Sequence, residues 1–392
     1  MIRRFLFLLG IFAFCNGFAQ DSVLTSIIRQ NNSLFAPSGN SFSGEGWRKI
    51  DSAIKSSKNV LIGEDHFLGE VPLFVDAIAQ RVKFDNFVIE IDPYSAALLQ
   101  NKINTLSTGQ FNEYEKTFGN TFSFYALEKE MDLLQKMVKN KTTIMGTDQV
   151  LMIADRLLCS ELKKITTNPA AKKLYDKIET ESKSHFDNFL KDPSKPMYML
   201  TQDFEETLNK LLAMKLSAQE TAQIKDIQLS RRIYIGQNHF LRLQLMKNNF
   251  YRLYYRQLEG KRNLFKFGAS HMCKGEGLLG GYDIGNIVYN IADSKFEKSL
   301  HILVVGKNGM KGTPFRGWSP QALDPDNGDL KALQPFFKEV KSKEWHCFDL
   351  TPVHKAISEG KLVINDIYLR RFVQGFDLLV VIPEVTAAGF KN

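Results

Sequence analysis

Short apolar segments alternate with helical patterns along most of the chain, and this alternation constrains the fold more than any other feature. Six segments are rich in β-branched or aromatic residues and are bounded by Gly, Pro, Asp or charged residues, as buried strands are. They are Asn59–Ile62, Asn86–Ile91, Thr142–Met145, Leu264–Gly268, Leu300–Val305 and Leu378–Ile382. Strands that alternate with helices form α/β sheets. The sequence therefore predicts an α/β fold with a mostly parallel central sheet flanked by helices.

Two stretches between the predicted strands have clear helical patterns. Ser123–Val138 has apolar residues at three- and four-residue steps and charges on the other face. From about 154 to 258 the chain is helical throughout, and Ser217 with Glu220 forms a capping box within it. Asp192–Pro196 breaks this stretch into at least two parts. We expect a large helical insertion at about 154–258.

The N-terminus has the features of a signal peptide. Arg3 and Arg4 precede the apolar run Phe5–Phe14, and Gly17-Phe18-Ala19 places small residues where a signal peptidase reads them. The run is too short to span a membrane, which takes roughly 20 apolar residues. We expect residues 1–19 to be removed and the protein to be exported, either to a periplasm or out of the cell.

The rest of the chain, residues 20–392, is expected to form a single α/β domain that includes the insertion. The apolar fraction of 44% supports a substantial core. No later segment is apolar enough to cross a bilayer, so the sequence predicts no transmembrane segment in the mature chain. Loss of Arg3 and Arg4 lowers the formal charge from +8 to +6, a modest and dispersed excess. A charge of this size does not indicate a nucleic-acid partner, so we expect a small-molecule substrate.

The cysteines do not indicate a disulfide framework. Cys15 would leave with the signal peptide, and the bulky Phe14 before it argues against a lipoprotein anchor. Cys159, Cys273 and Cys347 remain, an odd number without CxxC spacing. A structural zinc site is therefore not expected, and a single disulfide stays open without an identified pair.

The most informative hexapeptide is Leu61-Ile62-Gly63-Glu64-Asp65-His66. A predicted strand ends in glycine there, and carboxylates and an imidazole follow at once. In open α/β sheets, ligands bind beyond the carboxyl ends of strands. Glu70 comes four residues after His66, so the two side chains would share one face if a helix began here.

Three further predicted strands end in polar residues. They lead to Glu90 and Asp92, to Asp148, and to His271. Because all of these residues follow strand ends, we expect them to face one crevice with His66. An imidazole, with an ordinary pKa of about 6.5, can take a proton from water, and a second one can donate to a developing oxyanion. The same groups could instead bind one or two metal ions.

Two other reactive motifs are absent or unsupported. No serine lies in a G-x-S-x-G elbow, so a serine hydrolase of that type is not indicated. A literal G-x-G-x-x-G runs from Gly275 to Gly280, but His271 separates it from the strand and no clean helix follows. We interpret this segment as a loop rather than a dinucleotide site.

The order of these motifs resembles the erythromycin esterase family. Gly63–His66 with Glu70, then Val88–Glu90, then Gly146–Asp148, are similar to its opening motifs. Further matching segments are Ser230–Arg232, Gly236–Asn238 and Phe267–Met272. The resemblance covers roughly residues 55–275 and extends to a wider superfamily of Tiki-type metalloproteases and haem-uptake lipoproteins.

The resemblance implies a role for each residue. His66 would be the general base that activates water, and Arg231 could hold a carboxylate or oxyanion bidentately. The residues that would position His66 and the substrate or complete the site are Glu64, Glu70, Glu90, His271, Asp148 and Asn238. Enzymes of this kind open an ester bond without a covalent serine intermediate.

Three functions remain open from the sequence. The first is a hydrolase of an ester, lactone or related acyl bond. The second is a metal-dependent hydrolase or peptidase in which His66, Glu64, Glu90 and His271 hold a divalent metal. The third is a non-enzymatic protein that binds haem or another iron ligand, with the helical insertion as a lid. No cofactor is firmly expected, and a divalent metal stays open.

Overall fold

The computed structural model describes residues 22–391, so the predicted signal peptide and Cys15 lie outside the described residues. The chain divides into two compact units, each built from segments that are far apart in the sequence. The first comprises Met1–Val82, Phe267–Lys311 and Gln321–Ala387, and the second comprises Lys83–Lys266, Gly312–Pro320 and Ala388–Asn392. The single-domain organisation expected for residues 20–392 stays a prediction.

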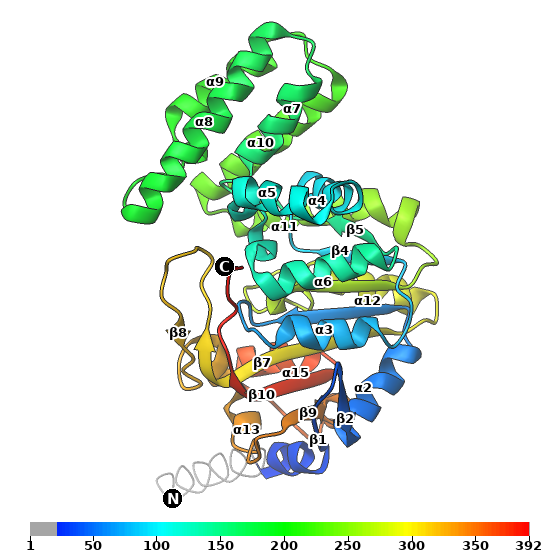
Figure 1. The fold of residues 1–392 in the computed structure, drawn as a ribbon. Helices are drawn as coiled ribbons and strands as arrows, with labels where there is room; N and C mark the ends of the chain where they lie inside the picture. Colours follow the sequence, from blue (N-terminus) through cyan, green and yellow to red (C-terminus); the bar gives the residue numbers. More distant parts are fainter. Residues whose placement is uncertain (1–21, 392) are drawn as a thin grey trace, which may run out of the picture. The chain divides into compact units, whose positions relative to one another are not determined.

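The first unit contains the longest strands of the described chain (Figure 1). Its strands are β1 (Asn32–Ser38), β2 (Ser41–Gly44), β3 (Asn59–Glu64), β7 (Ser299–Lys311), β8 (Gln321–Ala322), β9 (Trp345–Asp349) and β10 (Leu378–Val385). They lie in the order β2-β1-β9-β10-β7-β3, with β8 paired to β7. β10, β7 and β3 pair in parallel, whereas β2, β1 and β9 pair antiparallel at the edge. The carboxyl ends of β3, β7 and β10 therefore share one edge.

Helices cover the strands of the first unit. They are α2 (Glu45–Lys55), α3 (Val71–Ala79), α12 (Ile284–Ser294), α13 (Gln334–Phe337), α14 (Thr351–Ser358) and α15 (Ile367–Gly375), with the 3-10 turns η5 (Ala269–His271) and η6 (Gly328–Leu333). The middle of β7 is buried without interruption, as expected for a strand covered on both faces. At the antiparallel edge, a cluster of five aromatic rings joins β1, β2, α2, α3 and β9: Phe35, Phe42, Trp47, Phe74 and Trp345.

The second unit has three parallel strands in the order β6-β4-β5. They are β4 (Asn86–Ile89), β5 (Thr143–Gly146) and β6 (Asn263–Gly268), and β6 continues into the first unit at Phe267. Helices α4 (Pro93–Thr105), α5 (Thr108–Phe118) and α6 (Glu128–Lys139) follow β4, with the short turns η1 (Gly119–Thr121) and η2 (Ser123–Ala126) before α6. The helix predicted over Ser123–Val138 is thus a 3-10 turn followed by α6.

The remaining helices of the second unit occupy the stretch that the sequence predicts as helical. They are α7 (Asp155–Ile165), α8 (Pro169–Lys191), η3 (Tyr198–Leu200), α9 (Gln202–Leu212), α10 (Ala218–Gly236), α11 (His239–Leu253) and the π-helical turn η4 (Tyr254–Leu258). The helices α7 to α10 pack on one another around buried apolar side chains (Figure 1). α8 ends at Lys191, directly before the predicted break, and the Ser217–Glu220 capping box opens α10.

The predicted fold class is confirmed: the chain is α/β, with mostly parallel central strands flanked by helices. Each of the six segments predicted as strands overlaps a strand of the structure. The antiparallel edge strands β1, β2 and β9 were not predicted, because their short mixed sequences lack a continuous apolar run. Among residues 22–391, no helix is both long and apolar enough to cross a membrane.

Candidate functional site

His66 lies in a turn at the carboxyl end of β3. Glu64, the last residue of that strand, is buried, whereas 24% of the His66 side chain is exposed. His66 Nδ1 lies 2.9 Å from Glu64 Oε1. An ionised carboxylate can only accept, so the contact requires a proton on Nδ1. The strand end thus presents a histidine whose tautomer and orientation are set by a buried carboxylate.

The turn around His66 is held by the neighbouring strand β7. Asp65 forms an ion pair with Lys311 at the end of β7, and its backbone N–H donates to Val304 O at 3.0 Å. Phe67 adopts φ +66°, a left-handed conformation that is strained for a bulky side chain. Such a conformation persists only where the surroundings impose it, so these contacts explain how the turn is maintained.

Glu70 completes this anchorage rather than facing His66. Its carboxylate accepts the backbone N–H of Thr386 at 3.0 Å and the Thr386 hydroxyl at 2.6 Å, just beyond β10. The Gly69 N–H donates to Thr386 O at 2.8 Å. The condition under which His66 and Glu70 would share a helix face is not met, because α3 begins only at Val71 and residues 66–70 form turns.

His271 lies at the end of η5, which directly follows β6. His271 and Asp283 are 3% and 4% exposed, and His271 Nδ1 donates to Asp283 Oδ2. Asp283 Oδ1 also accepts the Ile284 N–H at 2.8 Å and so caps α12. The chain between these two residues contains the G-x-G-x-x-G segment, which is a loop closed by a bond from Gly277 N to Gly281 O, as interpreted from the sequence. The expectation that no clean helix follows this segment is wrong, because α12 begins at Ile284.

The two histidine turns come from neighbouring pieces of backbone. A Cβ added to Gly63 would lie 3.1 Å from Ala269 Cα and 2.8 Å from Phe376 Cε1. A side chain at position 63 would force the Phe376 ring or the η5 backbone to shift, so glycine is favoured where the end of β3 meets the start of η5. His66 follows Gly63 by three residues and His271 follows Ala269 by two, so both turns begin at this contact.

The polar residues of the second unit form an ion-pair cluster of their own. Arg242, on α11, donates through Nε and Nη2 to the two oxygens of Asp148 at 2.9 and 2.6 Å. Its Nη2 also donates to Glu90 Oε1 at 2.7 Å. Burial lowers the pKa of Arg242, but the two carboxylates outweigh burial and raise it overall. The cluster keeps the arginine charged, and a fork-shaped contact of this kind suits guanidinium geometry.

Asp92, beside this cluster, is a helix cap. Its Oδ1 accepts the N–H groups of Tyr94 and Ser95 at 3.0 and 2.8 Å at the start of α4. Burial raises the pKa of Asp92 to about 6. A cavity of about 30 Å³ adjoins Glu90, Asp92 and Asp148, a space sufficient for water but not for an organic substrate.

Arg231 and Asn238 have structural partners within the second unit. Arg231 donates to the Thr201 carbonyl at 3.1 Å and pairs with Glu205 at 3.1 Å. The Asn238 side chain accepts the Leu241 N–H at 2.9 Å and caps α11. Their predicted substrate contacts, like those of Asp148, stay predictions, as does the expectation that all the predicted residues face one crevice.

Sequence reasoning missed several partners of the site residues. Asp283 had a usable signal, since it directly precedes an apolar helical pattern, as N-cap residues do. Arg242 follows the Asn238 cap by one helical turn, but nothing in the sequence distinguishes it from a solvated arginine. Lys311 and Thr386 come from distant strand ends, so only the sheet order reveals them.

The donor atoms give no support for a resident metal. Within residues 22–391, no group of three or more His, Cys, Asp or Glu side chains is placed to hold a metal ion. The Nδ1 atoms of His66 and His271 are already directed at carboxylates. Cys159, Cys273 and Cys347 are buried and not disulfide-bonded.

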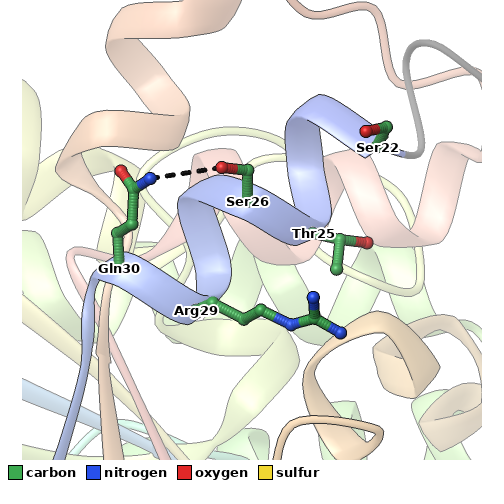
Figure 2. Close-up of a pocket in the computed structure, with 5 residues that line it drawn as sticks. All are labelled: Ser22, Thr25, Ser26, Arg29 and Gln30. Atoms are coloured by element: carbon green, nitrogen blue, oxygen red, sulfur yellow. Dashed lines mark hydrogen bonds between the residues drawn. The ribbon is translucent and has the colours of Figure 1, made fainter.

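One surface pocket lies apart from the predicted site residues. Figure 2 shows a pocket along the helix of residues 22–30, lined by Ser22, Thr25, Ser26, Arg29 and Gln30. All of these residues come from one helix, and Gln30 donates to Ser26 within it. None of the predicted site residues lines this pocket, so it is not part of the candidate site.

The protein is thus of an α/β class with histidine–carboxylate pairs at strand ends, and solved structures share its fold. A Bacillus cereus protein covers 95% of this chain and 99% of its own, with 14% identity and a TM-score of 0.56. A succinoglycan biosynthesis protein has the same coverage at 13% identity and a TM-score of 0.56. A mutant of the erythromycin esterase EreC, in its open conformation, covers 88% of this chain and 94% of its own, with 13% identity and a TM-score of 0.55.

These similarities show that the proteins share a fold, and one of the proteins with this fold is an esterase. No protein-family model and no curated protein sequence matches the chain.

Proposed function

We propose that this protein hydrolyses an ester, lactone or related acyl bond, with His66 as the general base. The observation that most supports the proposal is the contact between His66 Nδ1 and the buried carboxylate of Glu64 at 2.9 Å. General bases are recognised first by such geometry, in which a carboxylate orients an imidazole that is partly open to solvent. The fold shared with an esterase supports the same reaction class.

In the proposed reaction, Glu64 retains the proton on His66 Nδ1, and Nε2 takes a proton from water. The water oxygen attacks the carbonyl carbon, and the carbonyl electron pair moves to oxygen to form a tetrahedral oxyanion. Collapse of this intermediate breaks the bond to the leaving oxygen. That oxygen then receives the proton from His66, which yields a carboxylic acid and an alcohol.

His271 is proposed to orient the attacking water. The carboxylate of Asp283 faces Nδ1 and requires the proton there, so Nε2 of a singly protonated ring is an acceptor for an O–H group of that water. His66, with its larger exposure, is better suited to exchange protons with water.

The remaining residues are proposed to position His66 or the substrate and not to transfer protons. Glu70 positions the His66 turn through Thr386. Glu90, Asp148, Arg231 and Asn238 keep the substrate-related roles implied by the resemblance. We also propose export through residues 1–19, which N-terminal sequencing of the secreted protein would test by a start at Gln20.

The test is a hydrolysis screen of esters, lactones and peptides, with and without chelator. His66→Gln should lower kcat by about 100- to 10,000-fold, the usual range for loss of a general base. His185→Gln is the matched control, because the His185 ring bonds a backbone carbonyl, that of Pro196, at 3.0 Å. Equal activity of His66→Gln and the parent protein would refute the assignment.

Two further outcomes would favour the alternatives. Loss of activity with chelator, restored by a divalent metal, would indicate the metal-dependent hydrolase. A haem absorbance band after addition of haemin, with no hydrolysis of any substrate, would indicate the binding protein.

A further inference from the structure

Asp283 makes two contacts with different chemical consequences. Oδ1 accepts the Ile284 N–H at 2.8 Å, which is the ordinary role of an aspartate at a helix N-cap. Oδ2 accepts the Nδ1–H of His271. A helix cap needs only the first of these oxygens, so the second contact requires a separate explanation.

The start of α12 is held tightly against the His271 turn. A Cβ on Gly285 would lie 2.4 Å from Met272 C and 2.7 Å from Cys273 O, so the helix approaches that backbone as closely as glycine permits. Asn286 Nδ2 also donates to Lys274 O at 2.6 Å. These contacts fix Asp283 relative to His271 at the base of the intervening glycine-rich loop.

Because the contact between Asp283 and His271 is buried, it determines the proton position and the ring orientation of His271. Both side chains are 4% exposed, so water does not compete for Nδ1 or for the carboxylate. A carboxylate facing Nδ1 requires the proton there, and the ring orientation follows from the fixed position of α12. Nε2 then points away from Asp283, on the opposite side of the ring.

We infer that Asp283 is a positioning residue that fixes the tautomer and orientation of His271, with the proton on Nδ1 and Nε2 presented to the reaction. The inference rests on the proposed function for its kinetic consequence, but the tautomer itself can be measured without any substrate. In this arrangement the acid that begins α12 acts on the reaction only through His271.

Asp283→Asn separates the two roles. Asparagine is as good an N-cap as aspartate, and its Oδ1 would remain on the Ile284 N–H. Its NH2 group would then face His271 Nδ1 and, as a donor, would favour the tautomer with the proton on Nε2. A histidine held in the wrong tautomer loses its catalytic role without loss of fold.

The first measurement is the ¹⁵N NMR spectrum of histidine-labelled protein, with His271→Gln used to assign the signals. We expect the parent protein to show a protonated Nδ1 on His271, and Asp283→Asn to move the proton to Nε2. Identical His271 signals in the parent and Asp283→Asn proteins would overturn the inference, whether or not a substrate is known.

The second measurement is kinetic. We expect Asp283→Asn to lower kcat by about 10- to 100-fold and to leave KM within about twofold. In the His271→Gln background, Asp283→Asn should cause no further loss, because a residue that acts through His271 has nothing left to position. Additive losses in the double variant would overturn the inference.

Asp366 provides the matched control for a purely structural role. It caps α15 in the same unit through a bond from Leu369 N to Oδ1 at 2.8 Å. Asp283→Ser and Asp366→Ser both retain a capping residue and shorten the side chain. We expect only Asp283→Ser to lower kcat, and equal losses in the two variants would contradict the inference.

If the parent protein hydrolyses nothing while His271 shows the expected tautomer, the proposed function fails and the inference about Asp283 stands. If hydrolysis depends on His66 but not on Asp283, the inference fails and the proposed function stands.

Discussion

Gly63 and Ala269 lie so close together that a side chain at position 63 would displace the Phe376 ring or the turn that contains His271. The distance from an added Gly63 Cβ to Ala269 Cα would be 3.1 Å, and to the Phe376 ring 2.8 Å. Residues that are 206 positions apart in the chain are thus in close contact. The positions of both histidine turns depend on this contact.

Gly63→Val should therefore destabilise the protein by about 1–3 kcal/mol, the usual cost of overpacking a core. We also expect lower hydrolysis at temperatures where the variant is still folded, because the β3 and η5 backbones must move apart. Urea unfolding monitored by circular dichroism measures the first effect. Gly109→Ala, at a helical glycine with open space around it, is the control and should be neutral or slightly stabilising. Equal stability of the two variants would contradict this prediction.

Arg242 is expected to stabilise the second unit through its two buried carboxylate partners. Arg242→Met leaves the carboxylates of Asp148 and Glu90 without their shared cation, and breaking a buried ion pair costs about 3–5 kcal/mol. Denaturant unfolding provides the measurement. Lys116→Met removes an exposed partner of Glu113 and should change stability by less than about 1 kcal/mol. A loss for Arg242→Met no greater than that of the control would show that the cluster is not stabilising.

Asp155 should make the protein less stable as the pH rises from about 4 to 7. Burial raises the pKa of this carboxyl to about 7, although Ser182 and the Arg156 N–H donate to it at 2.6 and 2.8 Å. The unfolded chain ionises near its ordinary pKa of about 3.9, so the native state binds the extra proton between these values. The stabilising contribution is complete below the unfolded pKa and is lost as the pH approaches 7.

Asp155→Asn keeps the acceptor oxygen and removes the charge. Relative to the parent protein, it should gain stability between pH 4 and pH 7, by an amount on the order of a few kcal/mol. Thermal unfolding at several pH values measures this difference. A constant difference across the range would mean that Asp155 does not titrate in this window.

The three described cysteines should resist thiol reagents in the native protein. Burial raises the pKa of Cys273 and of Cys347 to about 12, and that of Cys159 well above its usual value. Since the thiolate is the reactive form, labelling should be slow until the chain unfolds. Reaction with a chromogenic disulfide before and after denaturant addition counts the accessible thiols. Rapid labelling of any of the three in the native state would contradict this expectation.

Local sequence was sufficient for the elements that bury apolar residues. The continuous apolar run Leu300–Val305 identifies a covered strand, and Ser217 with Glu220 identifies the start of a helix, because both signals depend only on neighbouring residues. Glu70 shows the limit of such signals. Its four-residue spacing from His66 fits a helix, but Thr386, far along the chain, provides its partner and the helix begins later.

The sequence by itself determined the α/β class, the approximate positions of six strands and the presence of a carboxylate two residues before His66. These follow from hydrophobic periodicity and from covalent neighbourhood. Only the tertiary structure decided that Asp283 accepts from His271, that Arg242 joins Glu90 to Asp148, and that Arg231 donates to the Thr201 carbonyl. Such pairings arise because buried polar groups must find partners wherever the packing of distant elements places them, and no local pattern encodes that choice.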